Sequence, residues 1–153
     1  MIFLTQSKPQ NMKKLSLLLL LPALLFACKK EDHKNTCTTD VSSISGSYKI
    51  TAYTYKASAS SPEQDYYNVI FTEACERDDI LTFNSNGNWT LQDAGVVCSP
   101  SGDDSGTWTL SGNSLSIDGD PATIESFDCK SLIVSNSDVL ITGDKLKITL
   151  TKQ

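Results

Sequence analysis

Three groups of acidic residues are spaced closely enough to act together on a substrate or a cation. They are Glu76/Asp78/Asp79, Asp103/Asp104 and Asp118/Asp120. Paired carboxylates hydrolyse glycosidic bonds, and clustered carboxylate oxygens bind calcium. The first group directly precedes a predicted strand, however, and the other two lie in turn-rich segments, where Asp bonds to the nearby backbone. We therefore interpret all three groups as local structural residues and predict neither a catalytic nor a metal site.

The sequence lacks the histidines and the motifs that most other kinds of catalysis require. His33 is the only histidine, and it lies in a polar segment near the N-terminus. The serines downstream of it therefore have no histidine base close in sequence, and no Gly-x-Ser-x-Gly elbow or phosphate-binding loop occurs. We expect a protein that is not an enzyme and that needs no cofactor.

The N-terminal segment has the layout of a secretory signal. Lys13 and Lys14 precede an apolar run over residues 15–26, and small Ala27 follows it. This run is too short to cross a membrane, which takes about 20 apolar residues. Met12 is a better start than Met1, because Met-Lys-Lys leads directly into the apolar run. We predict that residues 1–27 are a signal peptide.

The residues around the predicted cleavage point carry a recognisable motif. Leu25-Phe26-Ala27-Cys28 resembles the lipobox of bacterial lipoprotein signals. The resemblance implies that the Cys28 thiol receives diacylglycerol, that the chain is cut before it, and that the new amine is acylated. Several acyl chains anchor a protein stably. The alternative is an ordinary signal beside a chance cysteine. We expect a lipid-anchored protein of the cell envelope, at the outer membrane.

A polar segment follows the predicted lipidation site. Residues 28–45 cannot bury enough apolar surface to fold alone, so we predict a flexible tether there and a single domain over 46–153. Its beginning, Cys28 to Asp32, resembles the surface-export signal of Bacteroidetes lipoproteins, which implies exposure at the cell surface. A plain charged linker is the alternative.

The charge of the mature chain limits its partners. Three of the 13 basic residues leave with the signal, and the 18 acidic residues remain, so the formal charge is −8. Nucleic-acid binding needs a basic footprint, and attraction to an anionic membrane face needs one too. We predict no nucleic-acid partner and a membrane contact through lipid alone. The sequence identifies no protein partner.

Four cysteines remain besides Cys28. An even number in an exported chain suggests two disulfides, for which three pairings are possible. No Cys-x-x-Cys spacing exists, so a redox or zinc role has no support. The four residues are Cys37, Cys75, Cys98 and Cys129.

The domain has the residue pattern of β-strands throughout. Leu146, Ile148 and Leu150 alternate with polar residues, and Tyr48, Ile50 and Ala52 alternate with Lys49, Thr51 and Tyr53. Turn residues predict four hairpins: 80–83 with 88–91, 106–110 with 114–117, 123–127 with 131–135, and 139–142 with 145–151. Residues 58–71 are expected to form a long loop with one helical turn. About eight short strands at this spacing indicate a sandwich or a barrel.

The apolar faces of these strands define the expected interior. An aromatic and aliphatic face is usually core. If the interior instead holds a ligand cavity, we expect Tyr48, Phe83, Trp89 and Trp108 to line it. Tyr53, Tyr55, Tyr66 and Tyr67 are expected as rim residues, or alternatively as an exposed patch for a partner or a glycan. The inward-facing candidates are Tyr48, Ile50, Leu81, Phe83, Trp89, Leu91, Trp108, Leu110, Leu115, Ile117, Ile124, Leu132, Val134, Leu140, Leu146, Ile148 and Leu150.

Several segments together resemble a known family. They are Gly46-Ser47-Tyr48, the run from Cys75 to Asn84, Gly87-Asn88-Trp89-Thr90, Cys98, the run from Gly106 to Leu110, and the closing run from Leu146 to Lys152. This set resembles the lipocalin-like domain found in many Bacteroidetes lipoproteins, over roughly residues 44–153. The resemblance implies an all-β fold, a small up-and-down antiparallel β-barrel of about eight strands related to the calycins. It also implies a Cys75–Cys98 disulfide, which leaves Cys37 and Cys129 to each other.

Two functions fit this resemblance. The first is a membrane-anchored binding protein whose barrel holds a small apolar ligand. The second is a structural or interaction lipoprotein of the cell envelope with a filled barrel and no ligand. An eight-stranded barrel is compatible with both, because its interior is either just filled by side chains or holds one small molecule. The two functions differ in whether the interior is empty or filled.

Overall fold

A computed structural model describes residues 37–153 of the chain. The predicted signal peptide, the start at Met12, lipidation at Cys28 and the tether over 28–36 lie outside the described residues. The elements are α1 (Val41–Ile44), β1 (Gly46–Lys56), β2 (Gln64–Asp65), α2 (Tyr67–Ile70), η1 (Ala74–Glu76), β3 (Ile80–Phe83), β4 (Asn88–Gln92), β5 (Asp104–Ser111), β6 (Ser114–Ile117), β7 (Asp120–Phe127), β8 (Ser131–Ser137) and β9 (Lys145–Lys152).

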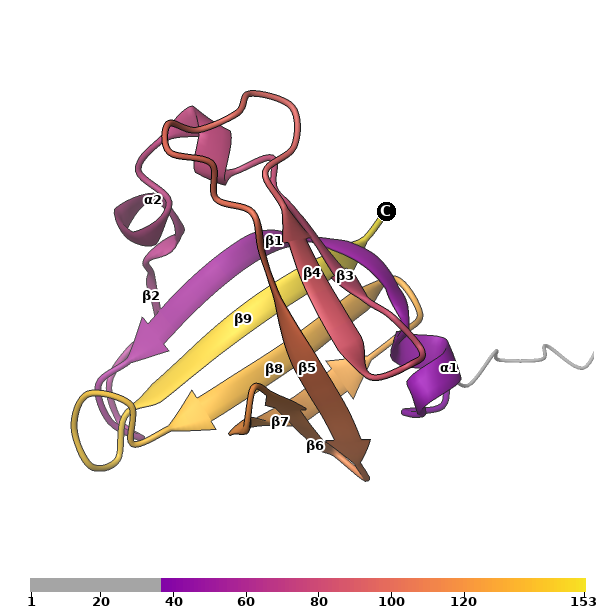
Figure 1. Ribbon diagram of the computed structural model, residues 1–153. Helices are drawn as coiled ribbons and strands as arrows, with labels where there is room; N and C mark the ends of the chain where they lie inside the picture. Colours follow the sequence, from indigo (N-terminus) through magenta and orange to yellow (C-terminus); the bar gives the residue numbers. More distant parts are fainter. Residues whose placement is uncertain (1–36) are drawn as a thin grey trace, which may run out of the picture. The chain divides into compact units, whose positions relative to one another are not determined.

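The strands form one antiparallel sheet that closes on itself. Strands β3 to β9 pair in sequence order, β1 pairs with β3, and β1 also pairs with β9, which completes the ring (Figure 1). Eight strands therefore make the barrel, and the two-residue β2 is an addition that pairs with β1. The predicted all-β, up-and-down barrel is confirmed. Closure leaves no unpaired edge in the ring.

A bulge in β1 changes which side chains face inward. Ile50 lies opposite Leu150, but Ala52, not Thr51, lies opposite Thr149. One extra residue reverses the alternation beyond it. Tyr53 and Tyr55 are consequently opposite Ile148 and Leu146, on the inner face. The predicted alternation, which grouped Tyr53 with the polar face, is wrong beyond Ile50 because no turn or glycine signal in the sequence marks this bulge.

The two ends of the barrel differ. Short turns join β3 to β4, β5 to β6 and β7 to β8 at one end, where α1 also lies, and we call this the closed end (Figure 1). Longer segments, 57–79, 93–103 and 138–144, surround the other end, which we call the mouth. The buried hydrophobic residues are Ile44, Tyr48, Phe83, Trp89, Trp108, Leu115, Ile124, Leu132, Val134 and Leu150.

Residues 37–45 are part of the folded domain, so the predicted tether extends too far along the chain. Cys37 is bonded to Cys129, and Ile44 is fully buried in the core. Asp40 caps α1 by accepting a hydrogen bond from the Ser43 N–H at 2.8 Å. Hydrogen bonds from Ser42 and Thr38 lower the pKa of the Asp40 carboxyl. The polar composition of residues 37–45 does not predict this packing, because a single buried Ile and a single disulfide hold the segment to the barrel.

The predicted strand over residues 139–142 is a loop instead. The buried carboxylate of Asp144 accepts hydrogen bonds from the N–H groups of Val139, Leu140 and Ile141 at 2.7, 2.8 and 3.0 Å. These amides are then unavailable to a strand ladder, so β8 pairs directly with β9. The Leu140 side chain is 75% exposed, which makes its prediction as an inward residue wrong.

Candidate functional site

Aromatic side chains pack tightly at the closed end. The rings of Tyr48 and Phe83 meet edge to face with centroids 5.9 Å apart, and Phe83 lies 5.2 Å from Trp108. The Tyr48 hydroxyl donates to the Ile44 carbonyl at 2.6 Å, and Trp108 Nε1 donates to the Asn84 carbonyl at 2.8 Å. Burial raises the pKa of Tyr48 to about 12. The Tyr48 hydroxyl and the Trp108 indole N–H therefore each have a hydrogen-bond partner inside the core.

The four residues predicted to line a ligand cavity are core residues of the closed end. Tyr48, Phe83 and Trp108 are at most 2% exposed, and Trp89 is 8% exposed. Trp89 Nε1 donates to Asp118 Oδ2 at 3.0 Å. None of the four lines the three cavities described below. We predicted these four residues because they are large and aromatic. Their rings instead fill the space near the short turns, and other residues line the cavities.

The half of the barrel nearer the mouth contains an apolar cavity of about 250 Å³. Its wall comes from β1, β3 and β6 to β9, and Asp120 and Asn136 are its only strongly polar members. The Asn136 amide is already engaged, since Nδ2 donates to the Pro121 carbonyl at 2.7 Å. The lining residues are Ile50, Leu81, Leu115, Ile117, Asp120, Ala122, Val134, Asn136, Ile148 and Leu150. The alternation pattern placed most of these inside the barrel but gave no signal that space remains beside them.

A smaller hollow of about 60 Å³ lies next to this cavity. The two share Ile50 and Leu81, and Leu91 and Phe71 extend the apolar wall. Three charged residues complete the lining: Glu76, Arg77 and Asp79. This is where the apolar interior meets ionisable groups.

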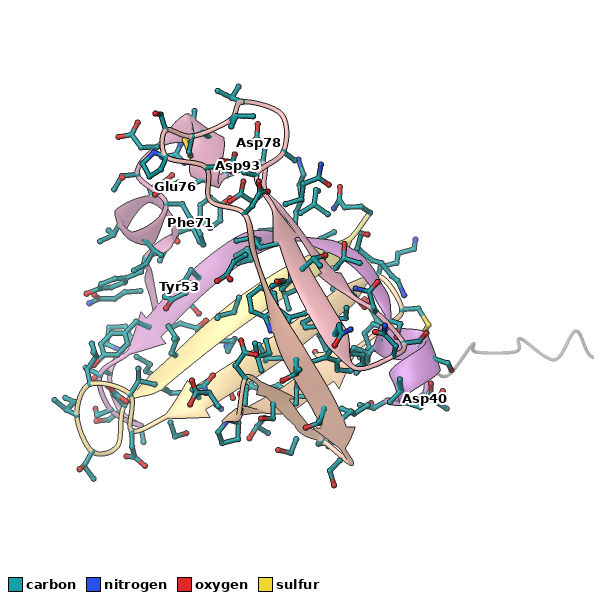
Figure 2. The ribbon with its side chains drawn as sticks, in the orientation of Figure 1. Asp40, Tyr53, Phe71, Glu76, Asp78 and Asp93 are labelled. Atoms are coloured by element: carbon teal, nitrogen blue, oxygen red, sulfur yellow. A yellow bond between two sulfur atoms is a disulfide. The ribbon has the colours of Figure 1, made fainter. Side chains whose placement is uncertain are left out.

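A third cavity, of about 240 Å³, is a groove on the rim of the mouth. Tyr53, Tyr55 and Leu146 form its floor, with α2 on one side and the 138–144 loop on the other. Tyr53, which lines the groove, meets Phe71, which lines the smaller hollow, edge to face with ring centroids 6.2 Å apart (Figure 2). Tyr55 likewise meets Tyr66 at 5.6 Å. The tyrosines are rim residues, as predicted.

Aspartates organise the loop between β4 and β5. Asp93 accepts from the N–H groups of Cys98 at 3.0 Å and Gly102 at 2.8 Å, and Asp103 accepts from the Asp93 N–H at 2.8 Å. Asp78 accepts from the Val96 N–H at 2.9 Å, and it lies beside Asp93 where β3 and β4 meet the loops (Figure 2). These carboxylates are structural, as expected for Asp in turns.

The disulfides join Cys37 to Cys129 and Cys75 to Cys98, which is the pairing that the family resemblance implied. The Cys75–Cys98 bond ties η1 to the β4–β5 loop, so two of the segments around the mouth are held together. Within residues 37–153, no group of three or more His, Cys, Asp or Glu side chains is arranged to hold a metal ion. The helices of this same region are too short to span a bilayer.

The closed ring of antiparallel strands, with one packed end and one hollow end, defines a calycin-type barrel. The family model of the lipocalin-like domain matches residues 44–148, and the chain belongs to this family. A comparison with curated proteins finds no match. Lipocalin-like domains are generally binding proteins and not enzymes.

Proposed function

We propose that this protein is a lipoprotein whose barrel binds a small apolar molecule in the half nearer the mouth. The apolar cavity of about 250 Å³ carries this proposal. Ligand sites are typically concave, mostly apolar and equipped with a few polar groups. The closed end is filled by aromatic residues, so the ligand enters from the mouth and stops above Leu115 and Leu150.

The anchor in this proposal rests on the sequence before the domain. The lipobox-like Leu25-Phe26-Ala27-Cys28 follows a charged start and an apolar run. Lipid on Cys28 would hold the domain to the cell envelope, at the outer membrane, and the charged residues after Cys28 favour the cell surface. Cys28→Ala should release the protein from membranes and abolish its labelling by radioactive palmitate. Labelling that persists in this variant would contradict the anchor.

Native mass spectrometry of the protein, purified gently from an oxidising compartment, tests the ligand. We expect an added mass that is lost on denaturation. Ala122→Phe should remove that mass, because Ala122 lines the cavity and a phenyl ring there occupies it. An added mass that survives Ala122→Phe would place the ligand outside the barrel.

A second function is favoured by the rim of the mouth. Val69, Val139, Leu140 and Ile141 are 44–75% exposed, and several of them border the tyrosine-floored groove. Exposed apolar side chains gathered in one region are typical of interaction surfaces. These exposed apolar side chains would be explained if the loops of the mouth bind a partner in the envelope and the barrel holds no ligand. A bare mass for the native protein would favour this alternative.

A further inference from the structure

The smaller hollow at the mouth joins an apolar wall to carboxylates. Ile50, Leu81 and Leu91 form its barrel side, and Asp79 and Glu76 stand on its mouth side. It shares Ile50 and Leu81 with the main cavity, so the two spaces are neighbours, and an elongated ligand would have to pass these two side chains to occupy both. The apolar part would lie in the 250 Å³ cavity, and one end would reach the 60 Å³ hollow.

Asp79 differs from the other aspartates of this region. Asp78, Asp93 and Asp103 each accept hydrogen bonds from backbone N–H groups of the β4–β5 loop. The Ala94 N–H hydrogen-bonds to the Asp79 carboxylate, but Oδ1 of Asp79 is buried and, like Oδ1 of Asp78, has no hydrogen-bond donor among the described residues. Asp79 is also the one of these four aspartates that lines the hollow. Buried acceptors in proteins are normally paired.

The charge around the hollow favours a cation over an anion. Burial, and then the nearby charge of Asp93, raise the pKa of Asp79, with smaller contributions from Asp78 and Asp103. Arg77 is the only cation in the lining. Its Nε donates to the Phe71 carbonyl at 2.9 Å and its Nη2 to the Thr72 carbonyl at 3.3 Å, so it braces the loop. A positive group on a ligand would relieve the repulsion that the aspartates exert on one another.

We propose that the barrel takes an apolar molecule with one cationic end, such as a protonated amine, and that Asp79 accepts hydrogen bonds from that end. This inference rests on the proposed binding function and specifies its ligand class. An ammonium group supplies up to three donors and a positive charge, which suit Oδ1 of Asp79. A carboxylate of the same chain length would instead meet two carboxylates in the lining and three more aspartates close by.

Three probes with the same apolar chain test the inference: n-octylamine, n-octanol and n-octanoate. Binding is measured by titration calorimetry on the full chain carrying Cys28→Ala, which removes the predicted lipidation site and avoids detergent. We expect octylamine to bind about tenfold more tightly than octanoate, with octanol between them, since charge-assisted hydrogen bonds are worth about this much. Asp79→Asn should weaken octylamine about tenfold and change octanol less than twofold.

Asp104→Asn is the matched control, because it removes the same charge from an exposed residue of β5 that lines none of the three cavities. It should leave the amine preference unchanged. Octanoate binding as tightly as octylamine, or an amine preference that survives Asp79→Asn, would overturn the cationic ligand while leaving apolar binding intact. Failure of all three probes to bind would overturn both the ligand class and the proposed function.

Discussion

The disulfide between Cys37 and Cys129 should stabilise the protein more than the one between Cys75 and Cys98. The first joins residues 92 positions apart, and the second joins residues 23 positions apart. In the chain-entropy model a crosslink restricts the unfolded chain more when it closes a longer loop. The model gives about 4.6 kcal/mol for the longer loop and about 3.4 kcal/mol for the shorter one. We expect a difference of about 1 kcal/mol.

Urea unfolding of two double variants measures these contributions. Cys37→Ser/Cys129→Ser and Cys75→Ser/Cys98→Ser are each compared with the unsubstituted protein without reductant, by circular dichroism. The first should lose more free energy of unfolding than the second. Ile44→Ala, which keeps both disulfides, should independently cost about 2–5 kcal/mol because Ile44 is fully buried. A loss below about 1 kcal/mol for both Cys37→Ser/Cys129→Ser and Ile44→Ala would mean that residues 37–45 are a tether after all.

Three further predictions concern the core, the rim and the mouth. Leu132→Ala, at a fully buried residue that lines none of the three cavities, should destabilise the protein by about 2–5 kcal/mol. Ala122→Phe should cost about 1–3 kcal/mol while blocking the cavity; similar losses of ligand mass in both would contradict the division into a packed end and a hollow end. Asp144→Ala should speed hydrogen exchange of the Val139, Leu140 and Ile141 amides at least tenfold, and unchanged exchange would show that the carboxylate does not hold the loop. Because the folded-state pKa of Asp79 is raised, stability should fall as pH rises from the unfolded pKa near 3.8 through the folded value. Asp79→Asn should therefore raise stability at pH 7 and have no such effect at pH 3, a pattern that urea titrations at both pH values would detect.

The two ends of the barrel explain why aromatic content alone did not indicate where the cavities lie. Tyr48, Phe83, Trp89 and Trp108 have the size and polarity expected of ligand contacts, yet short turns bring them together at the closed end. Large rings that meet in a narrow space fill it. Ala122 and Val134, by contrast, give no chemical signal of a site. They nevertheless line the cavity of about 250 Å³.

The sequence by itself determined most of the strands and the packed face of the closing strand, and its resemblance to the lipocalin-like family implied the barrel. Period-two alternation in Leu146, Ile148 and Leu150 and turn residues such as Asn86-Gly87 are local, so they are readable without coordinates. The tertiary structure alone decided the bulge at Thr51, the docking of Ile44, the loop held by Asp144 and the hollow beside Asp79. The bulge, the docking of Ile44 and the hollow depend on atoms brought together from distant parts of the chain, and a register shift of one residue reverses every side chain beyond it. The Asp144 loop is held by amides three to five positions away, but a buried carboxylate could not be foreseen from its composition.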